Sequence, residues 1–255
     1  MLYLQIIIAL MGAAIGSFLN VCISRIPAGE SLALPPSHCP KCQHAIRIYD
    51  NIPLASYLLL RGRCRDCRAR ISWQYPVVEL LTALLALFLF WKFGLTLKFL
   101  STCLFAGVLI VITFIDLEHW IIPDVLTLPG IPLFLLLAVF VMEVPLLDAI
   151  LGVLIGGGLL YAIAWGYELL AKREGMGGGD IKLLAMLGAF GGWKSLFFIL
   201  FVSSFLGALV GITMMLLKGK DLKYAIPFGP FLSLAALSYL FWGECLHRML
   251  FFRCP

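Results

Sequence analysis

Two aspartates at the edges of apolar segments are the residues best suited to chemistry in this chain. Asp180 follows a glycine-rich stretch, residues 175–179, and opens an apolar helix, while Asp116 closes another apolar run. A charged side chain at the edge of hydrocarbon is costly and is usually paired or functional. Two carboxyl groups that share one proton can activate a water and polarise a carbonyl. The sequence therefore predicts a membrane-embedded aspartyl peptidase with Asp116 and Asp180 as its catalytic residues.

Each aspartate alone also has an ordinary structural explanation. Asp180 could cap the N-terminus of its helix, and Asp116 could be a loop residue after one. The glycines do not indicate a nucleotide site, because Asp180 replaces the last glycine of G-x-G-x-x-G and no Walker lysine follows. They allow unusual backbone conformations and leave space for a substrate strand. Of the neighbours, Asp124 is expected to start a turn or cap a helix, Lys182 to pair with an acid, and Glu118 and His119 have no assigned role.

Four cysteines form two C-x-x-C pairs in the one polar segment of the chain. The pairs Cys39/Cys42 and Cys64/Cys67 are separated by 21 residues, a spacing close to that of zinc ribbons. Disulfides are the competing explanation, but thiols stay reduced if this loop is cytoplasmic. A loop with few apolar groups needs the metal for its folding, so we expect a structural Zn²⁺. His38 and His44 could be alternative ligands, but with four cysteines available we expect them to be ordinary loop residues. Cys22, Cys103 and Cys245 are expected to be buried small hydrophobic residues, and the sequence does not decide whether Cys254 is free or oxidised.

The composition indicates a protein that has lipid as its solvent. Of the 255 residues 62% are hydrophobic and 13% charged, about half the charged fraction of a soluble domain. We expect an all-α, polytopic membrane bundle of about eight transmembrane helices, with the first apolar run retained as a span. Such low charge density excludes a nucleic-acid binder. The expected helices cover residues 2–23, 77–92, 96–115, 130–143, 146–170, 181–192, 195–217 and 227–250.

The basic residues predict the orientation of these helices. With eight spans, 14 Lys and Arg residues fall on one side and five on the other, which places the polar loop in the cytoplasm. Both termini then lie outside, and Asp116 and Asp180 both fall on the cytoplasmic side. The chain divides into a first transmembrane helix (1–23), a cytoplasmic zinc-binding loop (24–75) and a seven-helix peptidase core (76–255). The cytoplasmic side holds Arg25, Lys41, Arg47, Arg61, Arg63, Arg65, Arg68, Arg70, Lys172, Arg173, Lys182, Lys218, Lys220 and Lys223.

Two further features belong to the helices themselves. The pairs Gly12/Gly16, Gly152/Gly156 and Gly207/Gly211 have the G-x-x-x-G spacing that lets helices approach closely, and we expect them to be scaffold. Glu79 follows Pro76 near the start of the second helix, where the helix dipole favours an anion. A substrate-binding role explains Glu79 equally well, and the sequence does not decide between the two.

Together these segments resemble the bacterial type IV prepilin peptidases, enzymes of the GxGD aspartyl protease type. The resemblance extends over nearly the whole chain, and the motifs in this order are highly specific. In the order of the chain they are Gly16-Ser-Phe-Leu-Asn-Val21 with Arg25-x-Pro27, the paired C-x-x-C loop, Tyr75-Pro-x-x-Glu79-x-x-Thr82, Phe114-Ile-Asp116 through Ile122-Pro-Asp124, Gly175-Met-Gly-x-Gly-Asp180-x-Lys-Leu and Ile226-Pro-Phe-Gly-Pro-Phe231.

The resemblance implies a bifunctional enzyme of the bacterial inner membrane. It would cleave the leader of type IV prepilins and type II secretion pseudopilins on the cytoplasmic side, with Asp116 and Asp180 as the dyad. It would then methylate the new N-terminal amine, usually of Phe, with S-adenosylmethionine. No segment has a soluble methyltransferase pattern, so the residues that bind this cofactor are unknown. The retained cysteines favour the metal-containing branch of the family.

Two other functions are compatible with the same residues. A membrane transporter or scaffold with a zinc module would use the two aspartates for an ion path. Acids of that kind usually lie near the bilayer midplane at broken helices, whereas Asp116 and Asp180 are predicted at the cytoplasmic boundary. A peptidase-only intramembrane protease would share the chemistry and differ only in its substrate.

Overall fold

The structure, a computed structural model, describes residues 2–171, 177–218 and 226–251 and is built from helices. The start of the glycine-rich motif (175 and 176), several predicted cytoplasmic charges (172, 173, 220 and 223), Arg253 of the predicted outer side, and Cys254 lie outside these ranges. The all-α prediction is confirmed, since the described residues contain only two isolated β-bridges and no strand. Each of the eight expected helices has a counterpart in the structure. In chain order these are α1 (Leu2–Arg25), α3 (Gln74–Phe93), α4 (Leu97–His119), α5 (Asp124–Phe140), α6 (Leu146–Ala171), α7 (Gly178–Gly191), α8 (Trp193–Lys218) and α9 (Gly229–Phe251).

Among the described helices, five are long and apolar enough to cross a membrane. They are α1, α3, α4, residues 146–166 of α6 and residues 193–217 of α8. The helix α5 and residues 229–243 of α9 are apolar but shorter. The count of eight spans therefore stays a prediction.

The helix α5 begins earlier than the sequence predicts. The apolar run predicts a helix over residues 130–143. The helix instead begins at Asp124, directly after Pro123, and continues through Pro129 and Pro132. Each proline removes a backbone hydrogen bond. The helix packs against α7 and buries Phe134 and Ala138, and this packing offsets that cost. Residues 120–123 form the short link between α4 and α5.

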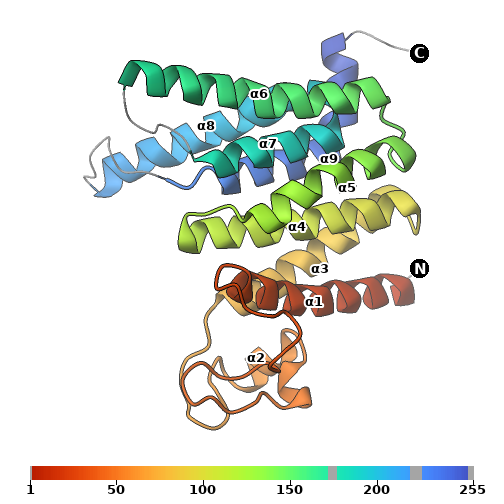
Figure 1. Cartoon of the computed structure of the whole chain (residues 1–255). Coiled ribbons are helices and arrows are strands. Elements are labelled where there is room, and N and C mark those ends of the chain that lie inside the picture. The colour runs from red at the N-terminus through yellow and green to blue at the C-terminus, as the bar shows by residue number, and fades with distance from the viewer. Residues whose placement is uncertain (1, 172–176, 219–225, 252–255) are drawn as a thin grey trace. The chain divides into compact units, whose positions relative to one another are not determined.

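The chain forms two compact units, residues 1–111 and 112–255, which are described separately. In the first unit α1 packs along α3 (Figure 1). A Cβ added at Gly12 would come within 2.8 Å of Cα of Ala83, and one at Gly16 within 2.7 Å of Cα of Glu79. These glycines let the two backbones approach closely, which confirms the packing role predicted for them.

The second unit is organised around α7. This helix contacts α5, α6, α8 and α9 and lies among them in Figure 1. Its residues 183–190 are all buried, which agrees with a short helix enclosed by protein. Gly152 of α6 meets Gly188 of α7 backbone to backbone, as the predicted close packing requires. By contrast, Gly207 and Gly211 have only ordinary van der Waals neighbours among the described residues.

The polar loop of the first unit contains two short helices that the sequence did not reveal. They are the 3-10 helix η1 (Ile48–Asn51) and α2 (Ala55–Leu59). Arg25, the last residue of α1, is buried. Its guanidinium donates to the carbonyls of Ser31 and Pro35 and so ties the first residues of the loop to the end of α1. Tyr57 of α2 packs against Trp73, which precedes α3, with ring centroids 5.5 Å apart.

Candidate active site and zinc centre

Asp116 lies in the last turn of α4 and not in the loop after it. Its side chain is 5% exposed. Its Oδ2 atom accepts a hydrogen bond of 3.0 Å from the backbone N–H of Gly229, the first residue of α9. A buried carboxyl group is costly unless it is hydrogen-bonded, and here the donor comes from a helix 113 residues further along the chain.

Asp180 is the third residue of α7. The N-cap of this helix is Gly177, and no side chain caps it, so the N-cap explanation of Asp180 is wrong. The Oδ1 atom of Asp180 is buried and has no hydrogen-bond partner among the described residues. The carboxyl groups of Asp116 and Asp180 are close enough to interact electrostatically. The fold of the second unit thus brings together the two acids that the sequence singled out.

Ile122, in the link after α4, contacts the starts of both α7 and α9. A Cβ added at Gly179 would come within 2.8 Å of Cβ of Ile122, and one at Gly229 within 3.2 Å of its Cδ1. The short link after α4 therefore packs directly against the first residues of α7 and α9. Gly179 is needed for this close approach, which gives the glycine before Asp180 a packing role.

The charged neighbours of the two acids form pairs at the ends of helices. Lys182 pairs with Asp124, as expected for Lys182, but Asp124 is the first residue of α5 and its N-cap is Pro123. Glu118 and His119 lie within 4.0 Å of each other on the surface. Neither of these two makes a described contact with Asp116 or Asp180.

The four cysteines of the loop converge on one point. All four Sγ atoms lie within 4.8 Å of one another, and the pairs Cys39–Cys67 and Cys42–Cys64 are 3.8 Å and 4.0 Å apart. Zinc–sulfur bonds of about 2.3 Å in a tetrahedron place sulfurs about 3.8 Å apart, so the cluster fits one Zn²⁺. The geometry does not fit disulfides, and among the described residues neither His38 nor His44 belongs to the cluster.

Each cysteine pair sits in the same tight turn. The amide of Gln43 donates to the carbonyl of Cys39 (2.8 Å), and the amide of Arg68 donates to that of Cys64 (3.1 Å). Gln43 and Arg68 both have positive φ angles, 60° and 59°. Two copies of one turn thus bring the four sulfurs together, an arrangement suited to a metal with four protein ligands.

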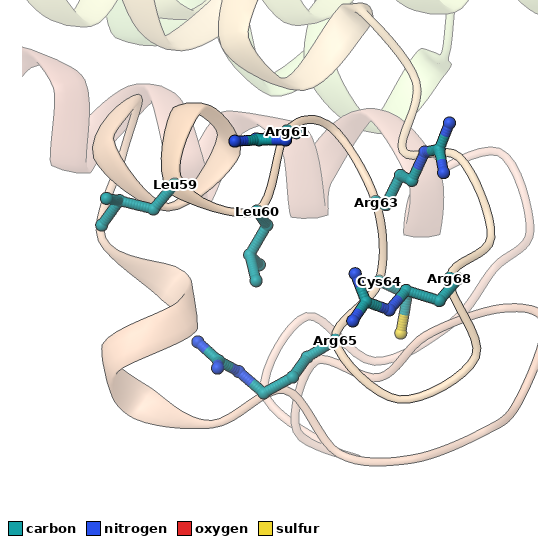
Figure 2. A pocket seen from close by; sticks show the side chains of 7 residues that line it. All are labelled: Leu59, Leu60, Arg61, Arg63, Cys64, Arg65 and Arg68. Carbon is teal, nitrogen blue, oxygen red and sulfur yellow. The ribbon is translucent and has the colours of Figure 1, made fainter.

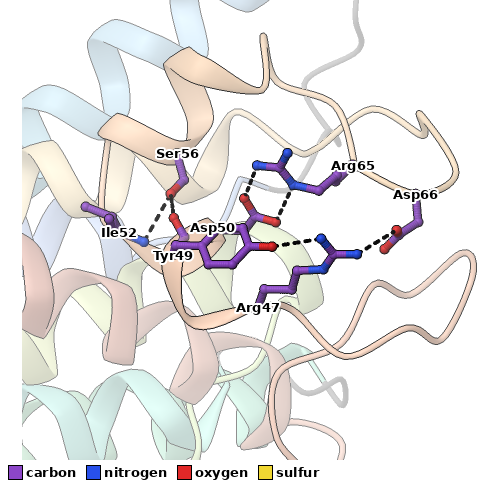
Figure 3. Close-up of polar contacts among 7 residues, drawn as sticks. All are labelled: Arg47, Tyr49, Asp50, Ile52, Ser56, Arg65 and Asp66. Atoms are coloured by element: carbon purple, nitrogen blue, oxygen red, sulfur yellow. Dashed lines mark hydrogen bonds and ion pairs between the residues drawn. The ribbon is translucent and has the colours of Figure 1, made fainter.

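A polar network connects the second cysteine pair to η1 (Figure 3). Arg65, between Cys64 and Cys67, donates to both carboxylate oxygens of Asp50 at 2.8 Å and 2.6 Å. These bonds lower the pKa of the Asp50 carboxyl. Arg47 donates to the hydroxyl of Tyr49 (2.7 Å) and lies 3.9 Å from Asp66. The network therefore joins the segment around η1 to the second cysteine pair through side-chain contacts.

The same loop has a cavity of about 500 Å³ with a strongly basic lining (Figure 2). Arg65 is paired with Asp50, but the side chains of Arg61, Arg63 and Arg68 have no ion pair with any residue that the structure describes. The excess of positive charge is of the kind that favours a cytoplasmic loop. The lining consists of Leu59, Leu60, Arg61, Arg63, Cys64, Arg65 and Arg68.

Glu79 connects this loop to the helices of the first unit. The helix α3 begins at Gln74, so Glu79 lies beyond its first turn and the dipole explanation does not hold. The carboxylate is 7% exposed and accepts a hydrogen bond of 2.8 Å from the amide of Leu54, just before α2. An anchoring role for the loop was missed, because the sequence gives no sign that Glu79 and Leu54 meet.

Comparison with known proteins matches both halves of the chain. The profile of the bacterial peptidase A24 N-terminal domain matches residues 10–93, and that of the type IV leader peptidase family matches residues 103–212. No solved structure gives a significant match.

Curated relatives extend the match over almost the whole chain, and each is named a prepilin leader peptidase/N-methyltransferase. The protein from Pseudomonas aeruginosa is 40% identical over 94% of this chain and 90% of the relative. The protein from Aeromonas hydrophila is 42% identical over 95% of this chain and 92% of the relative. The protein from Xanthomonas campestris is 39% identical over 92% of this chain and 90% of the relative. With its long apolar helices, the chain is an integral membrane protein, and it belongs to the type IV leader peptidase family.

Proposed function

We propose that this protein cleaves the leader peptide of type IV prepilins with Asp116 and Asp180 and then N-methylates the new N-terminus. The observation that carries the proposal is that buried Asp116 and half-buried Asp180, from helices far apart in the chain, lie close enough to interact electrostatically in a member of this family. It is supported by Oδ1 of Asp180, a buried carboxyl oxygen that has no hydrogen-bond partner among the described residues. Buried polar atoms normally have a partner, and a water or the substrate would supply one here.

The cleavage step needs one proton shared by the two carboxyl groups. The ionised carboxylate takes a proton from a water, whose oxygen attacks the scissile carbonyl carbon, while the protonated carboxyl donates to the carbonyl oxygen. The tetrahedral intermediate then loses the amine of the mature pilin, which leaves with one of these protons. The C–N bond breaks and a C–O bond forms, so no cofactor is consumed.

The second reaction transfers a methyl group from S-adenosylmethionine to the amine that cleavage releases. We infer that residues 24–75 form a module, held by Zn²⁺ on Cys39, Cys42, Cys64 and Cys67, which contributes to this step. The module lies between a first helix (1–23) and a peptidase core (76–255). Four protein ligands leave no open position on the zinc, so its role is structural.

We also propose the location and the wider substrate range. The distribution of Lys and Arg supports an enzyme of the bacterial inner membrane with its active site facing the cytoplasm and both termini outside. Pseudopilins of type II secretion share the leader that such a site would accept. A transporter or a zinc scaffold is not favoured, because the matched relatives are peptidases.

The test compares wild type with Asp116→Asn and Asp180→Asn in detergent or lipid, with a prepilin and labelled S-adenosylmethionine. We expect both variants to lose leader cleavage and to retain methylation of pilin that has already been cleaved. Retained methylation shows that the variants are folded and that the two reactions use separate sites. If either variant cleaves at nearly the wild-type rate, the two-aspartate mechanism is wrong.

A further inference from the structure

The first residue of α9 makes a direct contact with the candidate dyad. The buried N–H of Gly229 donates to Oδ2 of Asp116 at 3.0 Å. The first N–H groups of a helix have no acceptor within that helix, so they are free to bind an outside group. Here the acceptor is an acid to which the proposed function assigns the chemistry.

The contact requires a glycine because there is no room for a side chain. A Cβ at position 229 would lie 2.6 Å from Oδ2 of Asp116 and 3.2 Å from Cδ1 of Ile122. Side-chain carbons essentially never approach another heavy atom more closely than 3.0 Å. Any larger residue would therefore displace the carboxyl group or move the start of α9 away from it.

We propose that Gly229 is a positioning residue for leader cleavage. The terminal torsion of an aspartate is broad, so an unrestrained carboxyl group would sample many orientations. The N–H of Gly229 fixes Oδ2 and leaves Oδ1 of Asp116 for the water and for the proton shared with Asp180. The gain is preorganisation, since the group already has its orientation when the substrate arrives. The inference rests on the proposed dyad and adds a third element to it.

The first experiment measures cleavage and methylation by Gly229→Ala, with Gly158→Ala as a matched control. An added Cβ at Gly158, on α6, meets nothing within 4 Å. We expect Gly229→Ala to lower kcat for cleavage by about 100-fold with KM within about twofold, because a misplaced catalytic group costs that much. Methylation of pre-cleaved pilin and both activities of Gly158→Ala should stay at wild-type values. Cleavage by Gly229→Ala within about twofold of wild type would overturn the proposal.

A second measurement does not depend on the folding of Gly229→Ala. The sequence contains three Phe-Gly pairs, at Gly94, Gly191 and Gly229, so protein with ¹³C-carbonyl Phe and ¹⁵N-Gly gives three amide signals. Phe228→Leu removes and thereby assigns the signal of Gly229. We expect Asp116→Asn to shift this signal and to leave the other two in place. An unmoved Gly229 signal would overturn the contact.

The two proposals fail in different ways. If Asp116→Asn or Asp180→Asn still cleaves, the dyad itself is wrong, whatever Gly229 does. If both Asn variants are inactive while Gly229→Ala keeps the wild-type kcat, the dyad stands and only the positioning role is refuted.

Discussion

The Nζ atom of Lys182 lies 2.7 Å and 2.8 Å from the two carboxylate oxygens of Asp124, a contact that joins the start of α7 to the start of α5. Asp180 is two residues before Lys182, and α5 follows the link that leads from Asp116. The pair therefore connects the two segments that carry the candidate dyad. Both side chains are partly exposed, 36% and 56%, so the pair adds little to global stability.

We expect Lys182→Met and Asp124→Asn each to slow leader cleavage about two- to fivefold. This factor corresponds to the loss of up to about 1 kcal/mol, the stabilisation that an exposed ion pair gives. Because both variants lose the same contact, the double variant should be no slower than the worse single variant. The measurement is kcat for cleavage in this double-mutant cycle, with methylation of pre-cleaved pilin as the control. Effects that add independently would show that the contact does not act on the dyad.

Zinc content is the second prediction. Purified wild type should carry about one zinc per chain, measured by elemental analysis, because the four sulfurs have the separations of a tetrahedral site. Cys39→Ser or Cys67→Ser should lose the metal, and methylation should fall more than cleavage. Cys22→Ser and Cys103→Ser, in α1 and α4, should keep it. Wild type without bound metal, or with the cysteines oxidised, would contradict the assignment.

The bond between Asp50 and Arg65 gives a pH-dependent prediction. Because Arg65 lowers the pKa of Asp50 in the folded loop, the stabilisation is present above the unfolded pKa of about 4. It is lost as the pH falls through the lower folded-state value. At pH 7 Asp50→Asn should make the loop easier to digest with protease and its zinc easier to remove with a chelator.

The matched control is Asp66→Asn, since Asp66 only approaches Arg47 at 3.9 Å and both side chains are exposed. This variant should behave nearly as wild type. The difference in digestion between wild type and Asp50→Asn should shrink as the pH falls below about 4. A difference that stays constant down to that pH would show that the charge of Asp50 is not what holds the loop.

Much of this architecture follows from local patterns in the sequence. Asp180 could be singled out because an acid after a run of glycines, at the start of an apolar helix, is rare without a function. The cysteine pairs define their own turn and their own metal chemistry, so their meeting could be anticipated. The eight helices follow from apolar runs that need no information about partners.

The contacts that the sequence did not predict are the ones between distant segments. Gly229 stands 113 residues from Asp116, and nothing at either position indicates that they meet. The motif around Gly229 suggested that this segment matters, but only the packing of α9 beside the link at Ile122 shows why the residue must be small. The predicted start of α5 was wrong because it followed the apolar run from residue 130, and that run does not show that the helix begins at Asp124 and continues through Pro129.

The anchor between Glu79 and Leu54 gives the last prediction. Glu79→Leu leaves the half-buried amide of Leu54 without its acceptor, which should destabilise the docking of the loop by about 1–3 kcal/mol. Glu79→Gln retains an acceptor oxygen and should stay close to wild type. Thr82→Val, one turn further along α3, is the control, because among the described residues the hydroxyl of Thr82 bonds within its own helix, to the carbonyl of Val78.

We therefore expect Glu79→Leu to lose methylation and protease resistance of the loop in parallel, while leader cleavage by Asp116 and Asp180 persists. This order of effects follows because Glu79 holds the zinc-binding loop and the two aspartates lie in the other unit of the chain. Loss of cleavage with intact methylation would contradict the anchoring role, since it would assign Glu79 to substrate recognition by the peptidase. Equal losses in Glu79→Leu and Thr82→Val would mean that any polar change in α3 has the same effect, and the anchor would be refuted.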